Sequence, residues 1–187
     1  CSRANKLNNI HERIEMYRTL PYLGLFAATV LLQVFLFDNL SISVYLNPLV
    51  YIAFLILLPF ETLPVVLLGA GLLLGVTMDF AMGAAGINTI ATLLVAFLRP
   101  TLAGLTCGRE NAREGGIPSS GRLGERVFIN YVVVLTLLHH AVFFLLEALS
   151  WEHVLHTVVR IVVSSVVTVA FVWIAARIFT AQFSARV

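Results

Sequence analysis

The side chains best able to do chemistry in the apolar part of this chain are two adjacent histidines and a glutamate. His139 and His140 lie in the middle of an apolar run, and Glu147 follows His140 by about two helical turns, so both can share one helix face. A metal ion would need third and fourth ligands at a compatible depth, and His153 and His156 lie too near the end of the next run to meet His139. The pattern therefore favours hydrogen-bonded packing between helices, with a proton relay through His140 and Glu147 as the alternative.

A pair of opposite charges is expected near the facing ends of the last two apolar runs. Arg160 lies about two turns inside the last run, and Glu147 ends the run before it, so the two side chains should share a depth. A basic residue inside a bilayer needs a partner or a route to the interface. We predict a Glu147–Arg160 ion pair, with Asp79 as the competing acid. The pair is interpreted either as a structural clasp or as part of a contact site.

Single polar residues and glycines add further candidates for packing or partner binding. Arg99, near the end of its run, is expected to extend its side chain to lipid phosphate. Glycines spaced along one helix let backbones approach closely, although such patterns are common in membrane proteins. The polar candidates are Asp79, Asn88, Arg99, His140, Glu147 and Arg160, and the helix-packing candidates are Gly69, Gly71, Gly75, Gly86 and Gln33.

No motif of a known catalytic or cofactor site occurs in the sequence. There is no nucleophile–base pair, phosphate-binding loop, zinc signature or haem motif. Cys1 and Cys107 match no metal-site spacing and are expected to be unpaired thiols. The sequence therefore predicts no catalytic residue, no cofactor and no metal, and an intramembrane enzyme that uses His139, His140 and Glu147 is the weakest alternative.

The composition is that of an integral membrane protein. Of the 187 residues, 59% are hydrophobic and 12% are charged, against about 25% charged residues in soluble domains, and the mean hydropathy is +0.94. Residues 19–98 contain no lysine or arginine, as expected where basic side chains would meet lipid. The elements that position the candidate residues are therefore transmembrane helices of a single membrane domain, in contact with lipid and not with nucleic acid.

Six apolar stretches predict six transmembrane helices, at about residues 20–37, 46–59, 64–79, 87–104, 127–147 and 154–179. The second is short, at about 20 Å as a helix, and Pro48 and Pro59 bracket it. With six spans, the basic residues before the first span, in the loop of residues 105–126 and near the end of the chain fall on one face. Because basic residues stay in the cytoplasm, both termini are expected there.

Two segments outside the spans have expected roles. The loop of residues 105–126, rich in glycine, serine and arginine, is expected to be mobile and solvated, and its alternative role is contact with a cytoplasmic partner or anionic lipid. Residues 1–19 have the spacing of an amphipathic surface helix, without the pattern of a cleavable signal peptide. The tail of residues 181–187 is expected to be cytoplasmic.

Four stretches of the sequence together resemble the rod shape-determining protein MreD family, in its Bacteroidetes-type form. They are LLQVFLFDNL, LNPLVYIAFLILLP, GLLLGVTMDFAMGAAGINTIATLLVAFLRP and HHAVFFLLEAL. The resemblance covers residues 31–149, and the last helix agrees only in hydropathy and position. Its most specific part is the set Gly75, Asp79, Gly86, Asn88 and Arg99-Pro100.

The resemblance implies a non-enzymatic scaffold of the bacterial cell-elongation complex, in the inner membrane. Its implied partner is MreC, and through MreC it would be linked to MreB filaments inside the cell and to RodA and a class B penicillin-binding protein outside. The family is also similar in fold to the S components of vitamin transporters. The implied fold is therefore an S-component-like helical bundle, and a substrate-binding transporter subunit is the alternative function.

Overall fold

The computed structural model describes residues 20–37, 46–148 and 154–184, with side chains over residues 155–181 in the last range. These residues form helices and connections without a β-strand, so the expected all-α class is confirmed for this part of the chain. The predictions for residues 1–19 lie outside the described residues. Five helices are long and apolar enough to cross a membrane, namely Leu20–Phe37, α3 (Pro64–Met82), α4 (Ile87–Thr106), α7 (Glu125–Ala148) and α8 (Val154–Ser184).

The lengths and outer surfaces of these helices suit a bilayer. The 19 residues of α3 and the 20 of α4 rise about 28–30 Å, close to the roughly 30 Å of a hydrocarbon core. Large apolar side chains cover their outer faces, and Val65 and Phe80 on α3 are 81% and 86% exposed. Lipid chains solvate such side chains, whereas a soluble protein rarely exposes them over a continuous surface.

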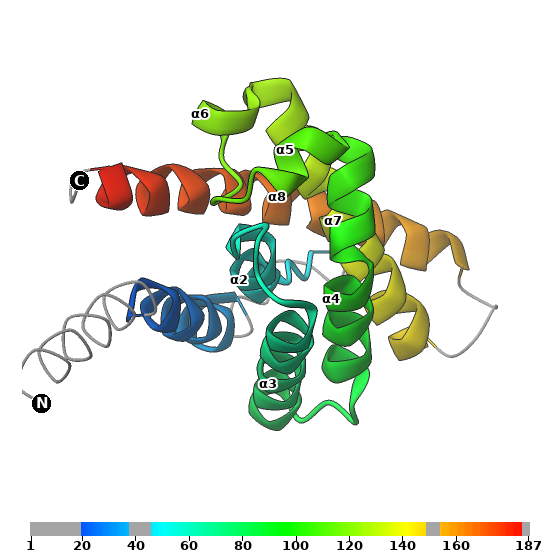
Figure 1. The fold of residues 1–187 in the computed structure, drawn as a ribbon. Helices are drawn as coiled ribbons and strands as arrows, with labels where there is room; N and C mark the ends of the chain where they lie inside the picture. The colour runs from blue at the N-terminus through cyan, green and yellow to red at the C-terminus, as the bar shows by residue number, and fades with distance from the viewer. Residues whose placement is uncertain (1–19, 38–45, 149–153, 185–187) are drawn as a thin grey trace, which may run out of the picture.

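The long helices pack in sequence, α3 on α4, α4 on α7 and α7 on α8 (Figure 1). Glycines shape the tight connection between α3 and α4. Gly83 ends α3 with a φ of 66°, and Gly86 precedes α4 with a φ of 89°, both in the left-handed region that favours glycine. From the sequence, Gly86 was expected both to shape the turn before the fourth span and to pack helices, and the structure shows the turn role.

The prediction of a transmembrane helix over residues 46–59 is wrong. Helical structure there is limited to the 3₁₀ turn η2 (Val50–Ile52) and α2 (Ala53–Leu57), and residues 49–58 are buried. The prolines at positions 48 and 59 bracket the stretch, and proline restricts helix extension. A run that is apolar on every side is also typical of a buried element. We call residues 46–58 the broken segment.

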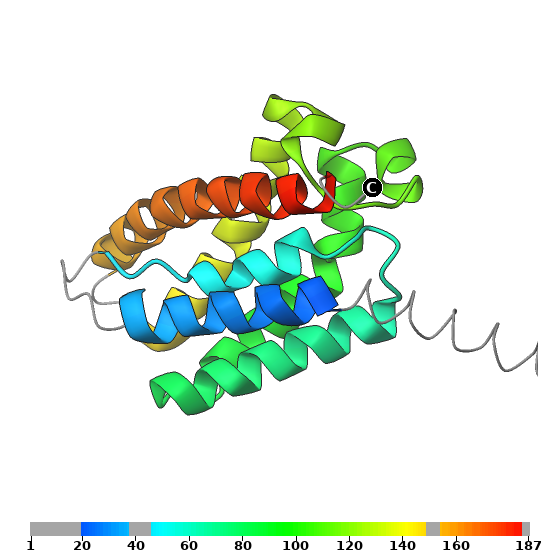
Figure 2. The same ribbon diagram turned by 90° about the vertical axis from the view of Figure 1, so that its left-hand side faces the viewer.

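The broken segment still runs from one end of the bundle to the other (Figure 2). Residues 46–49 are not helical and can span up to about 13 Å, and the eight residues of η2 and α2 add about 12 Å. In Figure 2 the start of the first helix, the connection into α3 and the end of α8 lie towards one end of the bundle. The α3–α4 connection and the start of α8 lie towards the other end.

The connection between α4 and α7 is more structured than the sequence indicated. It contains the short helices α5 (Arg109–Arg113) and α6 (Ser120–Leu123). Between them, Gly115 and Gly116 turn the chain with φ angles of 74° and 80°, which explains the glycine pair there. We call residues 107–124 the basic-end loop.

Candidate functional site

The interior of the bundle is organised around the broken segment, whose backbone needs partners. Water is excluded from a bilayer core, so irregular backbone is tolerated there only where protein groups satisfy it. The amide of Asn47 donates to Ser164 Oγ on α8 at 3.0 Å, and that of Leu49 donates to His140 Nε2 on α7 at 3.4 Å. Gln33 donates from Nε2 to the Pro48 carbonyl at 3.2 Å and accepts from the Val50 amide at 2.7 Å.

Arg99 holds the opposite end of the broken segment. Its Nη2 donates to the carbonyls of Leu58 and Ile56, its Nη1 donates to the carbonyl of Pro59 at 3.4 Å, and its Nε donates to Tyr131 Oη at 2.9 Å. The last carbonyls of a helix lack partners within it and carry partial negative charge. The guanidinium, with its five donors, therefore caps the end of α2.

The expectation that Arg99 reaches lipid phosphate is wrong, because the residue is only 2% exposed. Within the described residues no carboxylate forms an ion pair with it. Its charge is met by carbonyl dipoles, by the Tyr131 hydroxyl and by the ring of Phe60, whose centroid lies 5.6 Å from Cζ.

A chain of hydrogen bonds joins the middle of the broken segment to the α3–α4 turn. Tyr51 Oη lies 2.6 Å from Asn88 Oδ1 and 3.1 Å from His139 Nε2. Asn88 Nδ2 donates to Asp79 Oδ1 at 3.0 Å. Tyr51, Asn88 and His139 are fully buried, so each of these polar atoms depends on the others for a partner.

Asp79 is the acceptor for the first turn of α4. It accepts from the amides of Asn88 and Thr89, both at 3.0 Å, and from the side chains of the same two residues. A carboxylate at a helix N-terminus also interacts favourably with the helix dipole. Within the described residues Asp79 forms no ion pair with Arg160, so the competition predicted for that arginine is not observed.

The predicted Glu147–Arg160 ion pair is confirmed, with 2.9 Å between Oε2 and Nη1. The guanidinium also lies over the ring of Phe144, with Cζ 4.6 Å from the centroid. The side chains of Arg160 and Glu147 are 24% and 39% exposed, which leaves both accessible to a partner at this end of the bundle.

The glycines of α3 divide into two groups. A methyl group built on Gly71 would lie 2.9 Å from Ala96 Cβ, and one on Gly75 would overlap Thr89 and Thr92, all on α4. Gly71 and Gly75 are thus helix-packing residues, as expected. Gly69 is not, because it is exposed and nothing lies within 4 Å of the position of its missing Cβ. The face of α3 that carries Gly71 and Gly75 is therefore covered by α4 and is not open to a partner helix.

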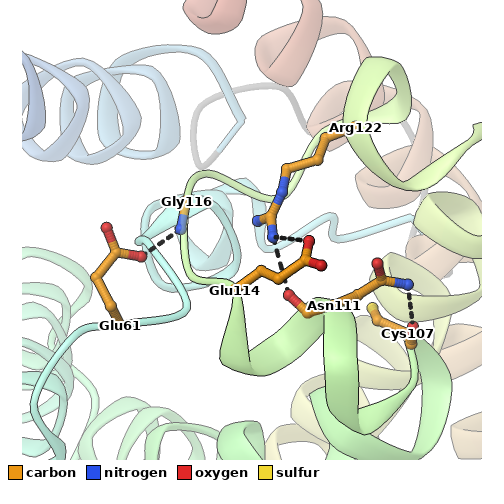
Figure 3. A network of polar contacts seen from close by, with 6 residues as sticks. All are labelled: Glu61, Cys107, Asn111, Glu114, Gly116 and Arg122. Atoms are coloured by element: carbon orange, nitrogen blue, oxygen red, sulfur yellow. Dashed lines mark hydrogen bonds and ion pairs between the residues drawn. The ribbon is translucent and has the colours of Figure 1, made fainter.

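The basic-end loop is tied to the connection between α2 and α3, and Figure 3 shows its polar contacts. Glu61 accepts from the Gly116 amide, and the Gly116 carbonyl accepts from the amide of Phe60 at 3.0 Å. Arg122 donates to the Asn111 carbonyl at 2.9 Å and lies 3.8 Å from Glu114. Glu61 is exposed, and its carboxylate helps to order this loop.

Cys107, at the start of the basic-end loop, has a protected thiol. The residue is 5% exposed, and burial raises the pKa of the Cys107 thiol above its ordinary value. Because the thiolate is the reactive form, we expect Cys107 to react slowly with alkylating reagents.

Sequence reasoning missed several residues that hold the broken segment. Tyr51 and Tyr131 were not candidates, although a buried tyrosine hydroxyl usually finds a partner. A serine or threonine in an apolar helix is by default a packing residue, but Ser164 and Thr168 bond to Asn47 and His140. The signal that could have found them is the lack of a full helix between Pro48 and Pro59, which leaves backbone groups to be satisfied.

The buried polar side chains described above mainly hold the broken segment in place between the helices. Within the described residues no three His, Cys, Asp or Glu side chains lie close enough to hold a metal ion. The chain matches no family model, no curated protein and no solved structure. The resemblance to the MreD family and the S-component-like architecture therefore stay predictions.

Proposed function

We propose that this chain is a non-enzymatic scaffold of the cell-elongation complex in the bacterial inner membrane and that its direct partner is MreC. The main support is the structural role of the residues that carry the most specific part of the resemblance to the MreD family. Gly75 seats α3 on α4, Asp79 and Asn88 organise the start of α4, and Arg99 caps the broken segment. Their contacts maintain one arrangement of helices, as a scaffold requires.

The surfaces proposed for partners lie at the two ends of the bundle. The Gly71–Gly75 face is covered by α4, so the proposed outer contact is the partly exposed pair Glu147–Arg160. The proposed inner contact is the basic-end loop, where Arg109 and Arg113 are exposed. Through MreC, the chain would be linked indirectly to MreB, RodA and a class B penicillin-binding protein.

We further propose that the basic-end loop and both termini face the cytoplasm. In support, the basic-end loop and the end of α8 lie towards one end of the bundle in Figure 2. Arginines occur throughout that loop, whereas residues 80–86, the end of α3 and the turn into α4, contain no lysine or arginine. This is the asymmetry that the positive-inside rule describes.

Cysteine labelling in intact cells tests this orientation. With Cys1 replaced by serine, we expect Ala85→Cys to react with a membrane-impermeant maleimide and Gly121→Cys to react only after the cells are permeabilised. Both positions are exposed, and a side chain at position 121 meets no atom within 4 Å. The parent with Cys107 alone is the background control, because that thiol is buried. Labelling of Gly121→Cys in intact cells would overturn the orientation.

Co-purification tests the proposed function itself. We expect the tagged chain, expressed with the MreC of the same genome, to retain MreC in mild detergent and not to retain an unrelated single-span protein of equal span length. Glu147→Lys should weaken the retention, whereas Glu125→Lys, which breaks the exposed ion pair with Arg177 outside both proposed contacts, serves as a charge-matched control. If MreC is not retained and a small molecule co-purifies instead, the scaffold proposal fails in favour of the transporter subunit.

A further inference from the structure

Two adjacent histidines in the middle of α7 have different hydrogen-bond partners. His139 and His140 are both fully buried. A neutral imidazole carries one N–H donor and one nitrogen acceptor, and its partners decide which nitrogen holds the proton. The partners of each ring therefore indicate its tautomer.

The partners of His140 require the proton on Nδ1. Nδ1 lies 3.0 Å from the carbonyl oxygen of Thr136, which can only accept. Nε2 lies 3.4 Å from the Leu49 amide, which can only donate, and 3.2 Å from Thr168 Oγ1. His140 Nε2 is therefore the acceptor that holds the backbone of the broken segment.

The partners of His139 require the opposite tautomer, and the reason begins at Asp79. The Asp79 carboxylate accepts from the backbone amides of Asn88 and Thr89 and from Asn88 Nδ2. The NH₂ group of Asn88 therefore faces Asp79, and Asn88 Oδ1 faces Tyr51. The Tyr51 hydroxyl uses its single proton to donate to that oxygen at 2.6 Å. Its contact with His139 Nε2 at 3.1 Å must then be donated by the histidine.

This assignment leaves His139 Nδ1 as a buried acceptor, and within the described residues it has no hydrogen-bond partner. The Thr136 hydroxyl is likewise buried and without a partner there. Thr136 precedes His139 by three residues on α7, so the two side chains lie on one helix face, one turn apart. Buried water molecules typically bond to such otherwise unsatisfied polar groups.

We propose that the two histidines are locked in opposite tautomers, His139 with its proton on Nε2 and His140 on Nδ1, and that one water molecule binds between His139 Nδ1 and the Thr136 hydroxyl. The water donates to the histidine and bonds to the threonine. The chain from Asp79 to His139 sets orientation and does not carry protons, because the Asn88 amide has no proton to pass on at Oδ1. The inference is independent of the proposed function.

Solid-state NMR of the full chain in lipid bilayers, with ring-¹⁵N histidine, tests both parts. Single replacements His139→Gln and His140→Gln assign the signals. We expect a protonated Nε2 on His139, a protonated Nδ1 on His140, and magnetisation transfer from water protons to His139 Nδ1. His140, whose two nitrogens both bond to protein groups, is the internal control and should receive little transfer.

Two variants separate the tautomer from the water. Thr136→Val, which keeps the backbone carbonyl that His140 needs, should abolish the transfer to His139 Nδ1 and leave both tautomers unchanged. Tyr51→Phe removes the acceptor for His139 Nε2, so the His139 tautomers should become mixed while His140 keeps its proton on Nδ1. A protonated Nδ1 on His139 in the unmodified chain would overturn the assignment, and equal water transfer to both histidines would overturn the water site.

Discussion

Replacing Arg99 with methionine is expected to destabilise the protein by about 3 kcal/mol or more. The change leaves the carbonyls of Ile56 and Leu58 and the Tyr131 hydroxyl without their donor, and each buried group that loses its partner costs about 1–3 kcal/mol. In a chain of this size such a loss lowers the midpoint of thermal unfolding by roughly 6–12 °C. Thermal unfolding in detergent, followed by loss of the monodisperse chromatographic peak, measures the effect.

The matched control for this prediction is Arg113→Met. Arg113 is an exposed arginine in α5, and removal of such a side chain is expected to change the stability by less than about 0.5 kcal/mol. Arg99→Lys should recover only part of the loss, because an ammonium group lacks the planar fork that bonds to the broken segment and to Tyr131 together. Equal midpoints for Arg99→Met and Arg113→Met would show that Arg99 does not cap α2.

Gly75→Ala is expected to force α3 and α4 apart, at a cost of about 3 kcal/mol. The added methyl group would overlap the backbone of Thr89 and the hydroxyl of Thr92. Backbone atoms within a helix cannot move aside locally, and such overpacking typically costs about 1–3 kcal/mol. The same thermal assay measures the loss, and Gly71→Ala should give a smaller one, because its methyl group would contact Ala96 Cβ at 2.9 Å.

Gly69→Ala on the same helix is the control for Gly75→Ala. Its methyl group would meet no atom within 4 Å, and alanine is favoured over glycine in a helix by up to about 1 kcal/mol. We therefore expect Gly69→Ala to be neutral or slightly stabilising. If Gly69→Ala and Gly75→Ala lower the midpoint equally, the destabilisation does not come from the contact between α3 and α4.

Some features of the site follow from sequence alone because they depend on local spacing. The depth of Arg160 in the last apolar run and that of Glu147 at the end of the run before it predicted their pairing, and the ion pair is present. The spacing of Gly71 and Gly75 predicted a packing face, and that face packs on α4. In both cases a helix of regular pitch converts residue number directly into depth and direction.

Other features could not be predicted because they depend on which element lies beside which. Arg99 near the end of an apolar run is compatible with lipid phosphate or with a buried acceptor, and only the position of α2 supplies the carbonyls that hold it. In the sequence, charge was the only criterion for a partner of Asp79, so Asp79 was considered as a partner of the distant Arg160. In the structure, the turns at Gly83 and Gly86 bring the start of α4 to the Asp79 carboxylate.

The sequence by itself determined that this chain is helical and apolar enough for a membrane, because hydropathy over a run of residues is a local property. Only the tertiary structure decided which apolar run is surrounded by protein. A helix facing lipid and a segment buried among helices are both apolar, so composition cannot distinguish residues 46–58 from a regular, lipid-facing transmembrane helix. The distinction comes from the polar side chains of neighbouring helices, chiefly Gln33, Arg99 and His140, which satisfy a backbone that could not remain exposed to lipid.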